Sequence, residues 1–228
     1  MRRFIKCVIV VGIVVALATG ANAAIIGLSG GTAGTIPRGV EPNDFIPSLF
    51  TGPIGGYYGS QVEVTYPTTF KLDFFGAEAG FINEFIFSGS STFIHPGGTI
   101  LASSLLTPLS TVSTTLLSGP SQLSFSFNVN SGSVSVINGL NPDDSAGGAL
   151  GQPNFFASFD PSGTAAGSGG TTGDILYLFL DDGAAGPDDD YDDFLVRITA
   201  NAVPIPGAVW LLGSGLIGLI GFRRRFRK

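Results

Sequence analysis

Short segments in which apolar and polar residues alternate recur along the chain. The clearest is residues 121–129, SQLSFSFNV, where apolar side chains at positions 123, 125, 127 and 129 alternate with polar ones. A period of two predicts a β-strand with one buried and one solvated face. The segment 174–180, DILYLFL, is apolar on both faces, which predicts a central strand covered on both sides. Weaker strand signals cover residues 61–75, 81–87, 99–106, 133–139, 154–159 and 194–200.

These strand signals predict the fold class. Between residues 24 and 202 no segment shows a 3.6-residue period with helix caps, and Gly, Pro, Asn and Asp separate the strand signals. About eight short strands with such turns predict an all-β domain, a single antiparallel β-sandwich of jelly-roll type. The Gly- and Pro-rich residues 24–60 are expected to be irregular, with one edge strand at most. The absence of a repeat argues against a β-solenoid.

The first 23 residues have the layout of a secretory signal peptide. Three basic residues within the first six precede an uncharged apolar run, residues 7–17, and Ala21-Asn22-Ala23 follows. A basic start, an apolar segment and an A-x-A site predict cleavage after Ala23, with an uncleaved anchor as the alternative. Cleavage would remove Cys7, the only cysteine, so the exported chain is expected to have no disulfide.

Charge is distributed unevenly. Residues 24–202 hold three basic residues against all 17 acidic ones, a net charge of −14, while the whole chain carries −6. A segment this acidic would repel nucleic acid and anionic surfaces, so we exclude both as partners. Multivalent cations are the expected counterpart.

The densest acidic segment is DDGAAGPDDDYDDF, residues 181–194, which joins two predicted strands. Seven carboxylates lie between residues 181 and 193. Because like charges this close repel, we expect Ca²⁺, which takes six to eight oxygen ligands in flexible geometry, to neutralise them. Strand alternation places Asp192 and Asp193 on opposite sides, so the acids cannot all bind one ion. The predicted ligands are Asp188, Asp190 and Asp192 (i, i+2, i+4), with Asp181 or Asp182 from across the hairpin.

Two alternatives limit this interpretation. The spacing is not that of an EF-hand loop, and a solvated acidic loop that keeps the protein soluble would give the same composition. A second acidic segment, Asn141-Pro142-Asp143-Asp144, is typical of an ordinary turn.

Nothing in the sequence predicts catalysis. Residues 27–31 (GLSGG) and 213–218 (GSGLIG) match the nucleophile-elbow and dinucleotide-binding patterns, but neither has the required strand and helix context. His95, the only histidine, precedes Pro96 and is expected in a turn rather than at a zinc ion. No feature selects a pair of carboxylates for glycoside hydrolysis. We therefore expect no enzymatic activity.

Residues 203–228 predict a membrane-spanning tail. Pro204 and Pro206 precede an uncharged apolar run, residues 208–222, at the low end of the length that spans a bilayer as a helix. The positive-inside rule places the basic end of the chain in the cytoplasm and the acidic domain outside. The residues of this topological stop are Arg223, Arg224, Arg225, Arg227 and Lys228.

This tail resembles the PEP-CTERM sorting signal of exported proteins in Gram-negative bacteria. The matching residues are Val203-Pro204-Ile205-Pro206, then AVWLLGSGLIGLIGF, then RRRFRK. The resemblance implies export through the inner membrane, retention by the tail, and processing near the Pro-x-Pro motif by an exosortase. It also implies a link to extracellular polysaccharide and biofilm matrix, and the same tail is also labelled an ice-binding protein C-terminal domain. Ile205 stands where the family has Glu, which leaves the processing enzyme open.

The sequence therefore predicts a signal peptide (1–23), an exported β-sandwich (24–202) and a sorting tail (203–228). The expected function is that of a non-enzymatic, Ca²⁺-stabilised protein of the bacterial envelope or extracellular matrix. A calcium-dependent, lectin-like carbohydrate-binding module is the alternative. Ice binding is a third option, although no regular Thr array is present.

Overall fold

The computed structural model of this chain describes residues 25–38, 42–65, 67–116, 120–146, 152–183 and 189–202, with Gly213 and Gly215. Among these residues, no helix combines the length and apolarity needed to cross a bilayer. Several predictions lie outside the described residues. They are the signal peptide with Ala21 and Ala23, Asp188, the motif Val203, Pro204, Ile205 and Pro206, and the basic end of the tail from Arg223 to Lys228.

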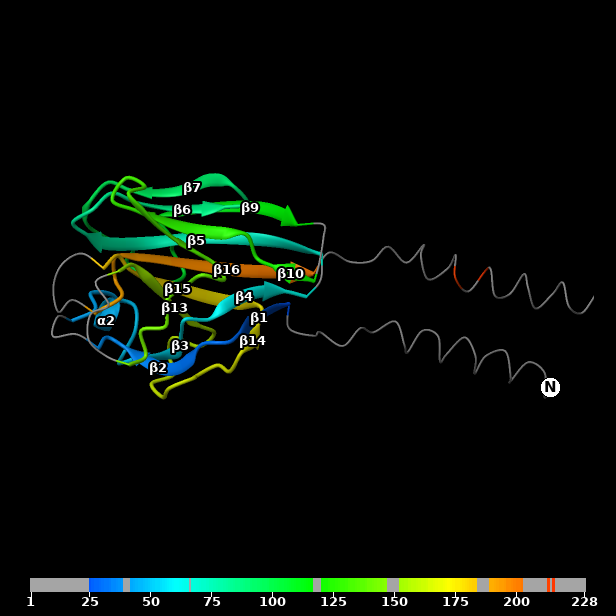
Figure 1. Ribbon diagram of the computed structural model, residues 1–228, viewed down its shortest axis with the longest axis horizontal. Helices are drawn as coiled ribbons and strands as arrows, with labels where there is room; N and C mark the ends of the chain where they lie inside the picture. Colours follow the sequence, from blue (N-terminus) through cyan, green and yellow to red (C-terminus); the bar gives the residue numbers. More distant parts are fainter. Residues whose placement is uncertain are drawn as a thin grey trace, which may run out of the picture.

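The described chain is all-β, and its strands form three antiparallel sheets (Figure 1). Sheet A has the order β10 (Ser121–Gln122), β4 (Gln61–Val64), β1 (Ile26–Ser29), β14 (Thr172–Gly173). Sheet C has the order β12 (Val134–Ile137), β11 (Phe125–Val129), β6 (Asn83–Phe87), β7 (Ser90–His95).

Sheet B is the largest, with eight strands. Its order is β2 (Thr32–Ile36), β3 (Ile54–Tyr58), β13 (Asn154–Ser158), β15 (Ile175–Asp181), β16 (Phe194–Ala202), β5 (Thr68–Ala79). The far side of β5 pairs with both β8 (Gly98–Leu101) and β9 (Ser110–Leu116). The short helix α2 (Phe45–Ser48) lies at the end of the sheet where β15 ends and β16 begins (Figure 1).

Two apolar cores cover the two faces of sheet B. On one face, Phe and aliphatic side chains of β5, β15 and β16 pack against those of sheets A and C, as in the ring pair Phe127–Phe194, whose centroids are 5.9 Å apart. On the other face, Phe75, Phe179 and Leu195 pack against α2 and the loops around it. The predicted two-sided burial of segment 174–180 is confirmed for residues 176–180, whereas Asp174 and Ile175 are exposed. All members of both cores lie between Ile25 and Ala200, so residues 24–202 retain this packing.

The prediction of an irregular segment at residues 24–60 is wrong. This segment contributes β1, β2, β3 and α2, and β1 lies inside sheet A rather than at its edge. Strand β3 has the sequence IGGYY, in which the glycines hide the alternation. A Cβ atom on Gly56 would lie 2.3 Å from the carbonyl oxygen of Ala157, so close strand packing requires glycine there.

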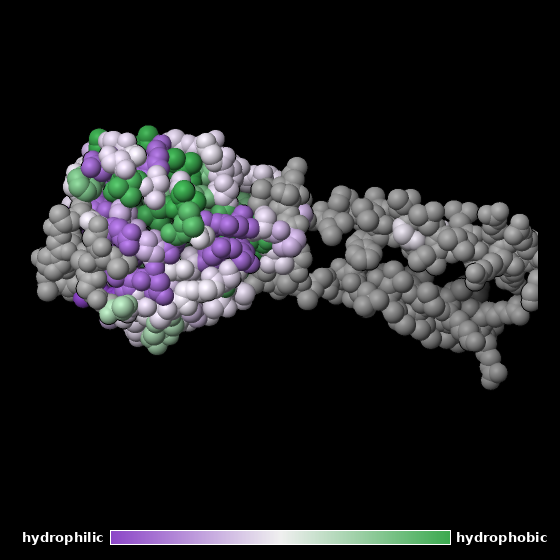
Figure 2. All heavy atoms as spheres, viewed as in Figure 1, coloured by the Kyte–Doolittle hydropathy of each residue, from purple (hydrophilic) through white to green (hydrophobic). Residues whose placement is uncertain are grey.

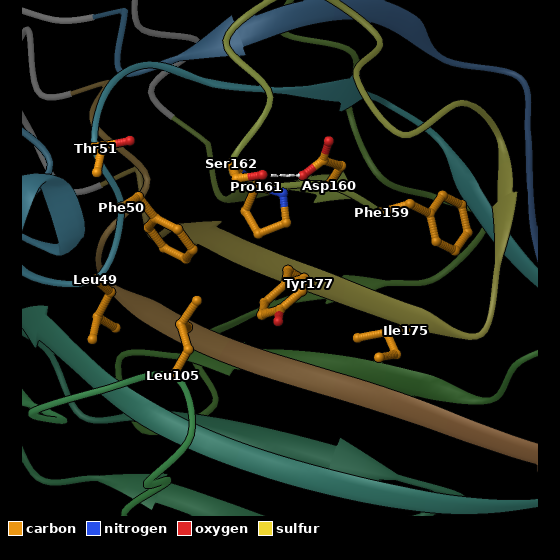
Figure 3. Close-up of a pocket in the computed structure, with 10 residues that line it drawn as sticks. All are labelled: Leu49, Phe50, Thr51, Leu105, Phe159, Asp160, Pro161, Ser162, Ile175 and Tyr177. Atoms are coloured by element: carbon orange, nitrogen blue, oxygen red, sulfur yellow. Dashed lines mark hydrogen bonds between the residues drawn. The ribbon is translucent and has the colours of Figure 1, made fainter.

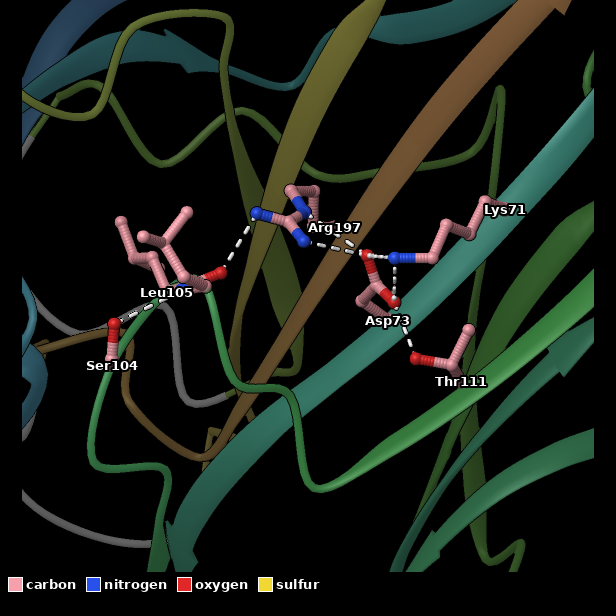
Figure 4. A network of polar contacts seen from close by, with 7 residues as sticks. Lys71, Asp73, Ser104, Leu105, Thr111 and Arg197 are labelled. Carbon is pink, nitrogen blue, oxygen red and sulfur yellow. Dashed lines mark hydrogen bonds and ion pairs between the residues drawn. The ribbon is translucent and has the colours of Figure 1, made fainter.

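An ion network ties together three strands on the α2 side of sheet B (Figure 4). Asp73 of β5 is fully buried, and its Oδ2 lies 2.7 Å from Nη2 of Arg197, its cross-strand partner in β16. On the other side, Thr111 of β9 donates a 2.6 Å hydrogen bond to Asp73 Oδ1. The half-exposed Lys71 lies 3.1 Å from the same carboxylate. Burial alone would raise the pKa of Asp73, but the hydrogen bonds from Thr111, Arg197 and Lys71 lower it.

Candidate metal centre

The hairpin between β15 and β16 contributes to two separate carboxylate clusters. The first, which we call cluster 1, contains Asp144, Asp181 and Asp189, all three buried. The second, cluster 2, contains Asp44, Glu78 and Asp192, of which Asp192 is buried. Within each cluster, one oxygen from each carboxylate lies within 4.8 Å of the others. The acids of the hairpin therefore do not converge on one point.

Cluster 1 joins three segments that are distant in sequence. Asp181 ends β15, and its Oδ1 accepts a 2.8 Å hydrogen bond from the Gly183 amide. Asp144 belongs to a segment that is fixed beside β13, because the Asn141 side chain exchanges two hydrogen bonds with the Phe155 backbone, of 2.8 and 2.9 Å. Asp189 is held through its carbonyl, which accepts a 2.9 Å bond from the Arg38 amide.

The carboxylates of cluster 1 are incompletely neutralised. Asp189 is 4% exposed, and its Oδ1 has no hydrogen-bond donor among the described residues. The nearby Arg38 donates to the backbone carbonyl of Asp144 and lies over the Tyr58 ring, 5.0 Å from its centroid. Within the described ranges, no ion pair reaches any of the three carboxylates. The charge of Arg38 thus offsets only part of the repulsion, by lowering the pKa of Asp144.

The polar neighbours of cluster 1 are also buried. The Tyr191 hydroxyl lies 2.7 Å from Asn154 Oδ1 and 3.3 Å from Asp144 Oδ2. Asn154 Nδ2 is buried and has no acceptor in the part of the chain that the structure describes. The site therefore presents carboxylate and amide oxygens in a region from which water is largely excluded.

Burial shifts the acidities of cluster 1. It raises the pKa of Asp181 to about 7, and the charges of Asp189, Asp182 and Asp144 add to this rise. It raises the pKa of Asp144 to about 6, with contributions from Asp189 and a partial offset by Arg38. Both shifts have one cause: ionised carboxylates are disfavoured when they are buried together without a cation. Such a set of hard oxygen atoms can hold a metal ion.

Cluster 2 ties α2 to the hairpin. Asp192 Oδ2 accepts a 2.6 Å hydrogen bond from the Asp44 amide, and the Asp192 carbonyl accepts a 2.9 Å bond from the Glu78 amide. Burial, followed by the charges of Glu78 and Asp44, raises the pKa of Asp192 to about 7. Asp44 and Glu78 are half-buried or more exposed, so water can solvate them. Cluster 2 is the weaker of the two candidates.

Among the predicted ligands that the structure describes, Asp181 and Asp192 do not share a site. Asp181 is in cluster 1 and Asp192 in cluster 2. Asp182 Oδ2 accepts a 3.0 Å bond from Asn83, and Asp190 Oδ1 a 3.3 Å bond from the Asp192 amide. The i, i+2, i+4 spacing assumed a strand. Residues 189–193 precede β16, and Tyr191 has φ +66°, so alternation does not extend to them.

Sequence reasoning missed four members of the clusters. Asp144 was assigned to an ordinary turn, and Asp189 was left out of the predicted ligand set. Asp44 and Glu78 carried no signal, since neither lies in a densely acidic segment. Only the fold brings these residues to the hairpin.

No family model, curated protein or solved structure matches this chain.

His95 is not in a turn, contrary to prediction. It ends β7, is fully buried, and pairs with Asn83 of β6. Neither imidazole nitrogen has a hydrogen-bond partner among the described residues. Burial lowers the pKa of His95, although the Gly98 backbone and the charge of Asp182 partly oppose this. A neutral imidazole is therefore buried close to the acidic hairpin.

A shallow groove of about 320 Å³ lies on the α2 side of sheet B, and none of its lining residues belongs to either cluster (Figure 3). Its floor is mostly apolar, with Tyr177 and Ile175 of β15 facing Phe50 and Pro161. Its one carboxylate, Asp160, already accepts hydrogen bonds from the hydroxyl and the amide of Ser162, at 2.5 and 3.2 Å. The groove is thus apolar in character, with a few hydroxyl groups at its rim.

Proposed function

We propose that this protein is an exported, non-enzymatic protein of the bacterial envelope or extracellular matrix whose β-domain is stabilised by Ca²⁺. The observation that supports calcium binding most directly is cluster 1. Its three buried carboxylates come from three segments, and one oxygen of Asp189 has no donor among the described residues. A bound cation would supply that missing partner and offset the mutual repulsion.

The donor set favours Ca²⁺ over other metals. Zn²⁺ prefers His and Cys ligands, and no His or Cys belongs to cluster 1. Mg²⁺ requires near-octahedral geometry and retains several waters, which suits an open site better than a buried one. Ca²⁺ accepts carboxylate, amide and backbone oxygens in irregular arrangements. Asp144, Asp181 and Asp189 would be its carboxylate ligands, with Asn154 close by.

Export and retention rest on the two ends of the sequence. Residues 1–23 support export through the inner membrane, and residues 203–228 support retention in the membrane by a PEP-CTERM-like tail that an exosortase would process. The two-sided packing of sheet B supports a jelly-roll-like sandwich for the domain between them. Extracellular polysaccharide is the expected environment. Replacing Pro204 and Pro206, then following the size and location of the full chain, tests whether the tail is processed.

One observation favours the lectin-like alternative. The groove beside Tyr177 combines apolar surface with the hydroxyls of Thr51 and Ser162, groups that commonly contact sugars. However, the groove lies apart from cluster 1, so sugar binding there would not depend on calcium. Binding of residues 24–202 to a glycan array, with and without a chelator, separates the two functions.

The calcium proposal is tested by thermal unfolding of residues 24–202 in Ca²⁺ and in a chelator. A free Ca²⁺ concentration of about 100 times Kd adds about 2.7 kcal/mol to the free energy of unfolding, which raises Tm by about 5 to 11 °C. Asp189→Asn should abolish most of this rise. Asp160→Asn, which removes a carboxylate outside both clusters, should leave it unchanged. Equal midpoints in Ca²⁺ and chelator would show that the proposal is wrong.

A further inference from the structure

Strand β9 forms an open edge of sheet B. Ser110–Leu116 pairs with β5 along residues 68–74, and no other strand in the described ranges pairs with it. No loop among those residues contributes a backbone hydrogen bond to it either. In an antiparallel strand, every second residue directs its N–H and C=O groups away from its one neighbour. The outer side of β9 therefore presents unpaired backbone groups to another strand.

This edge has none of the usual protections. Natural edge strands are guarded by charged side chains, by proline or by a β-bulge. β9 has the sequence STVSTTL, without charge or proline, and its register with β5 runs without a shift. It is also held in place, because Thr111 donates to the buried Asp73 (Figure 4). A regular, uncharged strand edge is a good template for strand pairing.

The chain around β9 is uncharged as well, although the half-exposed Lys71 of β5 lies opposite Ser113. Residues 85–142 contain no Asp, Glu, Lys or Arg, and they include β7, β8, β9, β11 and β12. Eight of the nine large apolar side chains that are exposed among the described residues lie between Ile82 and Leu140. Leu106 and Leu109, on the loop before β9, belong to this set, and Figure 2 shows apolar residues gathered on the face seen there.

A neighbouring strand extends this uncharged side. β7 packs over β5, with the Phe93 and Phe74 rings stacked at 5.7 Å. β7 is the edge strand of sheet C, and its Ile94 is 61% exposed. Two uncharged edges, β7 and β9, thus lie on one side of the molecule (Figure 1).

We propose that β9 pairs antiparallel with β9 of a second copy of this chain, joining two copies of sheet B across a two-fold axis. The charge distribution favours a second copy as the partner and the β9 edge as the contact surface. Residues 24–202 carry −14, so two copies repel each other over most of their surfaces, and the uncharged stretch is where they can approach. A strand that pairs with its own copy makes a closed, isologous contact, which gives a dimer rather than a fibre.

The register follows from the length of the strand. Ser113 is the middle residue of β9, so full overlap places it on the two-fold axis, opposite its own copy. Thr111 then faces Thr115 of the other copy, and their hydroxyl groups lie on the same face of the joined sheet. This contact involves no residue of cluster 1, so it can be tested in the absence of calcium.

A charge exchange at Ser113 tests the proposal. Full-length chain, solubilised in mild detergent, is compared by analytical ultracentrifugation with Ser113→Lys and Ser113→Glu chains, alone and mixed. Like charges opposite each other should weaken association about two- to fivefold in each variant alone. The loss should be larger for Ser113→Lys than for Ser113→Glu, because Lys71 of the same chain lies opposite Ser113 and offsets part of the Glu charge. Mixing the two variants should restore it, because Lys then faces Glu. The matched control Ser133→Lys, on an exposed turn of sheet C, should associate as the unchanged chain does.

A disulfide provides a second readout. In a full-length chain with Cys7→Ser, Ser113→Cys should form a disulfide-linked dimer under oxidising conditions, whereas Ser133→Cys should not. Three results would each overturn the proposal: a monomer at every concentration, association that neither Ser113 variant weakens, or weakening that mixing fails to reverse. Binding of β9 only to an extended peptide from another protein would also overturn it.

Discussion

Asp181→Asn should make the metal-free protein more stable. Asp181 is 6% exposed and lies in cluster 1 with two other carboxylates. Asn has the same shape, and its side-chain oxygen can still accept the hydrogen bond from Gly183. The substitution therefore removes one buried negative charge and leaves packing and hydrogen bonding nearly unchanged.

The magnitude follows from the acidity of this group. Burial raises the pKa of Asp181 from 3.8 to about 7, a difference of roughly three pKa units. Between these two values the folded state binds more protons than the unfolded state, so the free energy of unfolding falls as pH rises. At about 1.36 kcal/mol per unit, the loss reaches up to about 4 kcal/mol above pH 7. Asn does not titrate, so it avoids this loss. The free energy of unfolding of the variant should therefore exceed that of the unchanged protein by up to about 4 kcal/mol at pH 8, and by little at pH 4.

Calcium should reverse the order of stability. In excess Ca²⁺ the unchanged protein gains binding free energy, while Asp181→Asn loses a ligand and gains less. Urea unfolding of residues 24–202 at pH 4 and pH 8, each with Ca²⁺ or with a chelator, measures the difference in the free energy of unfolding between the variant and the unchanged protein under each condition. A variant that is less stable than the unchanged protein in chelator at pH 8 would refute the argument from uncompensated charge. A variant with the full calcium response would show that Asp181 is not a ligand.

Two further predictions concern buried polar groups outside cluster 1. Arg197→Leu should lower the free energy of unfolding by about 3 kcal/mol in urea titration, because it leaves Asp73 buried with its main partner removed. Lys71→Met, at a half-exposed partner of the same carboxylate, should cost less than about 1 kcal/mol, and equal losses would contradict this ranking. Burial lowers the pKa of His95, so below about pH 6.5 the unfolded state binds more protons and stability falls. His95→Met should therefore gain stability relative to the unchanged protein as pH falls from 7 to 5, and a constant difference in Tm would contradict this.

The pattern of apolar and polar residues in the sequence predicts part of this fold well, but it misses strands of two kinds. Strand β15 was predicted because ILYLFL can only be buried on both faces. Strand β3 was missed because its glycines serve close packing rather than alternation. Strand β9 was missed because its Ser and Thr residues carry no apolar period, and its conformation depends on pairing with β5. Local pattern thus predicts strands that bury side chains, but not strands that depend on a partner's backbone.

The alternation of apolar and polar residues also does not show to which sheet a strand belongs. The clearest alternation, residues 121–129, was predicted as one strand, and its apolar residues are indeed buried. The segment is divided between β10 in sheet A and β11 in sheet C. Leu123 lies at the crossing, where its amide bonds to the Val62 carbonyl. Alternation indicates which side chains face the core, but it does not indicate with which strand the segment forms its backbone hydrogen bonds.

The acidic hairpin was recognisable from composition, whereas its grouping into clusters was not. Asp144 lies 37 residues before Asp181, and it reaches the hairpin because Asn141 fixes its segment to β13. Similarly, Asp44 reaches Asp192 because α2 packs on sheet B. Charge density therefore indicates where a metal could bind. Which carboxylates share it depends on contacts between distant segments.

The charge distribution of the domain links the two proposals, calcium binding at cluster 1 and pairing of β9 between two copies. All acidic residues lie outside residues 85–142, so the sequence separates a charged part, which can take up a cation, from an uncharged part, which can contact another copy. A cation at cluster 1 would also reduce the net charge by which copies repel each other. Calcium should thus strengthen association without touching β9, and this effect should weaken as salt screens the remaining charge. A contact made through cluster 1 itself would behave differently, because the Ser113 variants would then leave association unchanged.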